Sequence, residues 1–96
     1  MNRKKVLIAL ENEEFDGISH VYEPYSGYNK HESYQLEMSV HGSTIEVVKV
    51  SRGKTFDGKE NERYEERKTT IYTGDKAIDF IEKRPYYFSQ IRPDLF

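Results

Sequence analysis

The sequence predicts an α+β fold: an antiparallel sheet of about five strands, as a meander or a partly closed barrel, with one helix packed on it in the C-terminal half. Residues 33–50 alternate apolar and polar side chains around a glycine, as hairpin strands do. Residues 75–83 place their apolar side chains on one helical face. Aromatic residues make up 14% of a chain that is only 35% hydrophobic, so rings and β-branched residues are expected to build the core.

The individual elements follow from short apolar runs bounded by turn-forming residues. A chain of 96 residues has the length of one domain, and residues 1–96 are taken as such. The strands are expected near residues 4–10, 18–23, 33–40, 45–52 and 64–73, and the helix near residues 75–83. The expected core residues are Val6, Ile8, Leu10, Ile18, Leu36, Met38, Ile45, Val47, Ile71, Ile78 and Ile81.

The central hairpin is expected to turn at His41 and Gly42, because glycine tolerates the positive φ of a two-residue turn. That turn pairs Met38 with Ile45. The alternation slips after Val47, where a second valine follows directly. The slip predicts either a β-bulge at this point or a strand buried on both faces.

Three further segments carry expectations about packing. The mixed charges of residues 63–68 predict cross-strand ion pairs on a solvated face. Cations stand beside rings in residues 83–87, which predicts cation–π packing at the helix end or an exposed anchor for a partner. The aromatic tail, residues 86–96, is expected to pack back on the sheet, and otherwise to be such an anchor.

Composition and charge argue against several classes of protein. The chain has no cysteine, which excludes disulfides and thiolate metal sites and suits a reducing, cytoplasmic compartment. The chain has 15 Lys and Arg residues and 17 Asp and Glu residues, so its charges are nearly balanced. It therefore has neither the basic excess of a duplex-DNA binder nor the acidic excess of a DNA mimic. No apolar run approaches the roughly 20 residues that span a bilayer, so we expect no membrane segment.

No motif for catalysis, a cofactor or a metal stands out from the sequence. The acidic segments 11–16 and 57–62 lack the order of a Ca²⁺ loop, and His20, His31 and His41 lack zinc-site spacing. The Gly53-Lys54-Thr55 run lacks the first glycine of a phosphate-binding loop. We therefore expect no enzyme, no cofactor and no metal site.

The best candidate for function is the tyrosine-rich segment, residues 22–34. Its expected partner-binding residues are Tyr25, Tyr28, Lys30, His31 and Tyr34. Tyrosine gives a large contact area at low entropic cost, and the neighbouring Ser, Gly and Asn adapt to a partner. The same rings could stack the bases of single-stranded nucleic acid, or could simply cover a thin core.

These observations predict a non-enzymatic module that binds another protein, of inhibitor, immunity or regulatory type. The size and the lack of motifs are typical of small phage or mobile-element proteins. The alternative is a module that binds single-stranded nucleic acid. An exposed edge strand would also allow a homodimer through sheet pairing.

Overall fold

A computed structural model of the chain describes residues 1–26, 32–56 and 61–96, and the side chains of residues 1–21, 34–53 and 64–96. The elements in chain order are α1 (Arg3–Glu11), β1 (Ser19–Ser26), β2 (Glu32–His41), β3 (Thr44–Phe56), β4 (Asn61–Tyr72), α2 (Gly74–Lys83), α3 (Tyr86–Ser89) and the 3₁₀ turn η1 (Pro93–Leu95).

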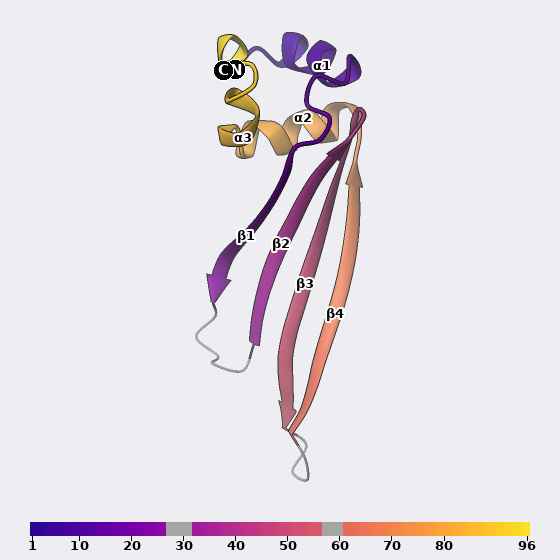
Figure 1. Cartoon of the computed structure of the whole chain (residues 1–96), viewed down its shortest axis with the longest axis vertical. Helices are drawn as coiled ribbons and strands as arrows, with labels where there is room; N and C mark the ends of the chain where they lie inside the picture. The colour runs from indigo at the N-terminus through magenta and orange to yellow at the C-terminus, as the bar shows by residue number, and fades with distance from the viewer. Residues whose placement is uncertain (27–31, 57–60) are drawn as a thin grey trace.

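The four strands form one antiparallel sheet in the order β1-β2-β3-β4, and the helices gather at one end of it (Figure 1). This arrangement confirms the α+β class and the meander. Over residues 1–26, 32–56 and 61–96 the sheet has four strands where about five were expected, with β1 and β4 at its edges, so these strands do not close into a barrel. The strands expected near 18–23, 33–40, 45–52 and 64–73 and the helix near 75–83 are all present.

The strand expected at residues 4–10 is wrong, because this segment forms helix α1. The Asn2 side chain caps the helix by accepting a hydrogen bond from the backbone N–H of Lys5 at 3.1 Å. Val6, Ala9 and Leu10 are the buried residues, and their spacing is that of one helical face. A continuous apolar run suits a buried strand and a buried helix equally, so periodicity alone did not separate the two.

The central hairpin turns one residue later than expected. His41 pairs with Thr44, which leaves Gly42 and Ser43 as the turn, and Gly42 takes the positive φ of 62° that such a turn requires. Met38 consequently lies opposite Val47 instead of Ile45. The pairing predicted from a turn at residues 41–42 is therefore wrong by two positions.

The β-bulge suggested at Val47 is also absent, since both ladders of β3 keep a continuous register there. The other interpretation of the broken alternation holds, because Val47 is buried on one face of the sheet and Val50 on the other. The sheet's register shift lies in β1 instead, between Tyr22 and Tyr25.

The core lies where the helices cover one face of the sheet. The expected core residues that are buried are Val6, Leu10, Met38, Ile45, Val47, Ile78 and Ile81, with Ile18 and Leu36 half-buried. Ile8 and Ile71 were wrongly assigned, being 49% and 52% exposed. Two rings, Phe15 and Phe88, are fully buried and meet edge to face with centroids 5.3 Å apart. Phe88 belongs to the aromatic tail that was expected to pack, whereas Phe15 was not among the expected core residues.

The tail folds back, as expected, but chiefly onto other helical and turn segments. Phe88 and Leu95 are buried, whereas Tyr86 and Ile91 are exposed. The Asn2 backbone N–H donates to the Leu95 carbonyl at 3.0 Å, and the two termini lie together in Figure 1.

The molecule is elongated, with extents of 56 × 21 × 19 Å. The helices occupy only one end, and β3 and β4 run furthest from them (Figure 1). The alternation of side chains divides the sheet into two surfaces. We call the surface that carries Leu36, Met38 and Val47 the helix-facing side, and the surface that carries Glu37, Val50 and Arg67 the outer face.

Candidate functional site

The tyrosine-rich segment is described only in part. Tyr28, Lys30 and His31 lie outside the described residues, and of Tyr25 only the backbone is described, in β1 opposite Tyr34. Tyr34 is half-buried, and the Lys49 Nζ lies 4.7 Å from the centroid of its ring, a cation–π distance. The partner-binding role of this segment therefore stays a prediction.

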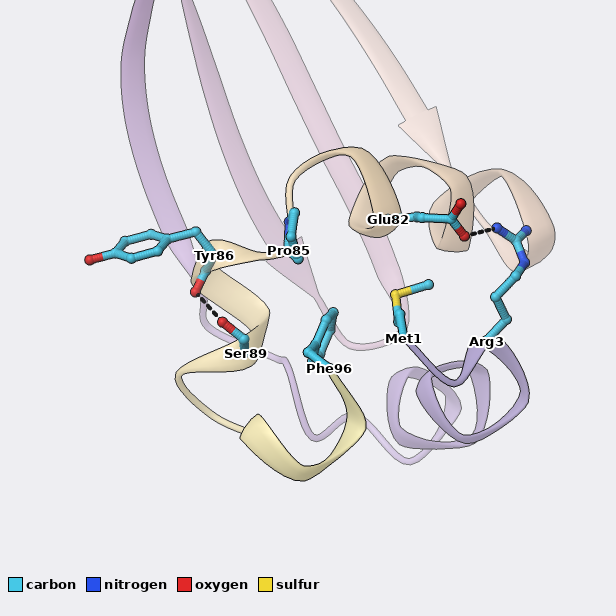
Figure 2. Close-up of a pocket in the computed structure, with 7 residues that line it drawn as sticks. All are labelled: Met1, Arg3, Glu82, Pro85, Tyr86, Ser89 and Phe96. Atoms are coloured by element: carbon cyan, nitrogen blue, oxygen red, sulfur yellow. Dashed lines mark hydrogen bonds and ion pairs between the residues drawn. The ribbon is translucent and has the colours of Figure 1, made fainter.

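Two surface hollows offer further candidates, and the first lies at the helical end of the molecule (Figure 2). Its volume is about 630 Å³. We call it the helical-end hollow, and its lining residues are Met1, Arg3, Glu82, Pro85, Tyr86, Ser89 and Phe96. Tyr86 is 66% exposed and its ring projects away from the helices, and Met1 is 40% exposed.

Three polar side chains of the helical-end hollow, those of Arg3, Glu82 and Ser89, already have partners. The Arg3 guanidinium holds Asp79 at 2.7 Å and Glu82 at 2.5 Å, and these hydrogen bonds raise the pKa of Arg3 above its ordinary value. The Ser89 hydroxyl donates to the Tyr86 carbonyl at 2.9 Å. What this hollow presents is therefore apolar and aromatic surface beside a mixed-charge rim.

The second hollow, of about 240 Å³, lies on the helix-facing side just beyond the end of α2. We call it the basic hollow, and its lining residues are Leu36, Val47, Lys49, Lys68, Thr70, Tyr72, Phe80 and Arg84. Strands β2, β3 and β4 form its floor, and the C-terminal part of α2 with Arg84 forms its wall. Three of its lining side chains are cationic and none is acidic.

The cations of the basic hollow are held close together by the sheet. Lys49 and Lys68 are direct cross-strand partners, and both point to the helix-facing side. Like charges directly opposite each other destabilise a sheet. The Arg84 guanidinium carbon lies 5.0 Å from the centroid of the Phe80 ring, which in turn stacks on Tyr72 at 5.3 Å.

These positions correct and extend the expectations from sequence. Arg84 makes a cation–π contact at the end of α2, but its ring is Phe80 within the helix and not one of the tyrosines of residues 83–87. Tyr86 is exposed, which an anchor for a partner within residues 83–87 would require. The basic hollow was missed, because pairing Lys49 with Lys68 depends on a strand register that the sequence pattern does not specify.

The expected cross-strand ion pairs of residues 63–68 are present on the outer face. Arg52 pairs with Glu65 at 3.5 Å, and Arg67 pairs with Glu37 at 3.6 Å. Within the described side chains, no group of three or more histidine, aspartate or glutamate residues could hold a metal ion. None of the helices in the described part of the chain is long and apolar enough to cross a membrane.

No family model matches the chain, and neither the curated proteins nor the solved structures compared with it provided a match.

Proposed function

We propose that this chain is a non-enzymatic protein-binding module, of inhibitor, immunity or regulatory type, that uses the helical-end hollow as its contact surface. The observation that carries the proposal is the exposed ring of Tyr86, beside exposed Met1 and the half-buried Phe96, at the edge of an apolar hollow. Tyrosine and methionine are enriched in the cores of protein interfaces, where a few such residues supply most of the binding energy.

The rim of the hollow supports a protein partner over a small ligand. Small-molecule sites place a few polar groups so that they fix the ligand's orientation. Here Arg3 is bound by two carboxylates and the Ser89 hydroxyl by a backbone carbonyl. An apolar centre with a paired, mixed-charge rim suits an apolar side chain of another protein. We keep the cytoplasm as the compartment, since a small cysteine-free chain suits a reducing environment.

The test is a pull-down from nuclease-treated lysate of the native cell with wild type, Tyr86→Ala and Ile71→Ala. Ile71 is the matched control, because it is 52% exposed but lies on the outer face of β4. We expect one protein partner to be retained by wild type and Ile71→Ala and lost by Tyr86→Ala. With that partner purified, the Tyr86→Ala affinity should fall about 30-fold, the equivalent of a hot-spot residue.

Two further outcomes decide between this surface and the alternatives. A partner list that Tyr86→Ala leaves unchanged would remove the helical-end hollow from consideration. Loss of the partner with Tyr25→Ala/Tyr28→Ala alone would assign recognition to the tyrosine-rich segment. An aromatic contact should also change little in affinity between about 0.05 and 0.5 M salt, because screening acts on charges.

A further inference from the structure

We propose that the basic hollow is a binding site for a phosphate group, carried either by a small phosphate ester or by single-stranded nucleic acid. The proposal does not depend on the helical-end hollow, and concerns different residues. Lys49 and Lys68 reach this hollow from β3 and β4, and Arg84 reaches it from the residue that follows α2. The net charge of the whole chain is −2, so this local excess of positive charge runs against the average.

The two lysines carry the argument, because the fold places them where they repel each other. They are opposite each other on β3 and β4, and among the described residues neither has a carboxylate within ion-pair distance. Glu66 lies two residues before Lys68 on the same side of β4 but does not line the hollow. A bound anion between the lysines would relieve their repulsion.

The chemistry of the cations favours phosphate over a carboxylate. Lysine binds phosphate as a compact point charge, and arginine matches its oxygens with a planar fork of donors. One carboxylate would compensate a single cation, whereas a phosphate ester carries up to two negative charges. The hollow's 240 Å³ lies below the roughly 300–1,000 Å³ of sites for drug-sized ligands, so it suits a phosphate with a small organic body.

Beyond the hollow, the helix-facing side of the sheet carries two tyrosine rings. Tyr34 lies next to Lys49 on the helix-facing side, and Tyr64 follows further from the helices, opposite Gly53. A Cβ added at Gly53 would lie 2.6 Å from the Tyr64 hydroxyl, so the Tyr64 side chain covers the glycine. Tyrosine rings beside cations are a usual platform for the bases of a single strand. Here Tyr34 adjoins Lys49, and Glu66 lies between Tyr64 and Lys68.

The experiment follows backbone amide resonances of the whole chain during titration with four probes: inorganic phosphate, thymidine monophosphate, decathymidylate and hexaglutamate. We expect phosphate-containing probes to shift the amides of Lys49, Lys68 and Arg84. If decathymidylate binds far more tightly than thymidine monophosphate, the source is a strand, and equal affinities identify a small ester. In the strand case the affinity should fall with salt, with a logarithmic slope of about −0.7 for each phosphate contacted.

The test variant is Lys49→Gln/Lys68→Gln. The control is Lys76→Gln, which removes one positive charge from the exposed side of α2, away from the hollow. The double variant should weaken phosphate binding about tenfold or more, and the control should leave it within about twofold. The same spectra show whether each variant is folded. Without phosphate the double variant should melt close to wild type, because losing the repulsion offsets losing the Lys49–Tyr34 cation–π contact.

Three outcomes would overturn the proposal. One is that no phosphate probe shifts these amides at millimolar concentration. Another is that the double variant binds as tightly as wild type. The third is that hexaglutamate binds as tightly as decathymidylate, which would point to an acidic protein segment instead of a phosphate.

Discussion

Val50 shows how a side chain can be buried on a surface that no helix covers. It lies on the outer face of β3, between Gln35 and Arg67, and is fully buried. Five polar side chains form a closed ring of contacts on the same face. Gln35 contacts Glu37 at 3.0 Å, and Glu37 contacts Arg67 at 3.6 Å. Arg67 contacts Glu65 at 3.3 Å, Glu65 contacts Arg52 at 3.5 Å, and Arg52 contacts Gln35 at 3.4 Å. The long stems of such residues can shield a neighbouring apolar side chain while their polar ends stay in water, which accounts for the burial of Val50.

We predict that Val50→Ala destabilises the chain by about 1–2 kcal/mol, because it removes two buried methyl groups beneath this ring. Val21→Ala is the matched control. Val21 is on the same outer face, in β1, but is 55% exposed, so its truncation should cost less than about 0.5 kcal/mol. Urea unfolding of both variants measures the difference. Equal losses would mean that the polar ring does not shield Val50 from water.

The same residues show what a sequence pattern can and cannot resolve. Two adjacent valines at 47 and 48, with another at 50, indicated that β3 buries both faces or bulges, and the pattern could not choose between them. The choice depends on partners in β2 and β4 that meet Val50 only once the register is set. A turn displaced by one residue moves every pairing of its hairpin by two, as it did between β2 and β3. The pairing of Lys49 with Lys68 depends on the separate register of β3 and β4, which the sequence pattern does not specify.

At the level of elements, prediction succeeded where the periodicity was long and failed where the apolar run was short. The alternation of β2 and the single apolar face of α2 each extend over several residues, and both elements are present. In α1 the sequence is apolar from residue 6 to residue 10 without a break, which fits either structure. Asn2, which caps α1 four residues before this run, is the local signal that would have favoured a helix.

The tail contributes to stability through particular residues and not as a uniform segment. Phe88 of α3 is fully buried against Phe15, while Tyr86, two residues earlier, is 66% exposed. We predict that Phe88→Ala costs about 3–5 kcal/mol and Tyr86→Ala less than about 0.5 kcal/mol. Thermal and urea unfolding of the two variants measure this contrast.

This pair of variants also controls the functional test. Tyr86→Ala must stay folded for its loss of a partner to be meaningful, and its melting temperature shows whether it does. If Phe88→Ala were as stable as wild type, the tail would not be part of the core. A large loss in Tyr86→Ala would instead show that its ring packs in solution.

At the scale of the whole molecule, the helices and the sheet differ in extent. A compact chain of this length has a radius of gyration of about 12–13 Å. The Cα radius of gyration here is 16.7 Å, because the helices cover only one end of the sheet and the strands continue beyond them. The basic hollow, Tyr34 and Tyr64 lie on the part of the sheet that extends beyond the helices. The elongated shape therefore leaves the proposed phosphate surface accessible.

We predict that small-angle X-ray scattering, extrapolated to zero concentration, gives a radius of gyration well above that of a compact chain and close to the 16.7 Å of the Cα atoms. The edge strands β1 and β4 leave a homodimer through sheet pairing as a proposal. Sedimentation at two concentrations must therefore accompany the scattering, since a side-by-side dimer would also enlarge the particle. A monomer with a radius near 13 Å would contradict the extended sheet, because such a value requires the strands to fold back onto the helices.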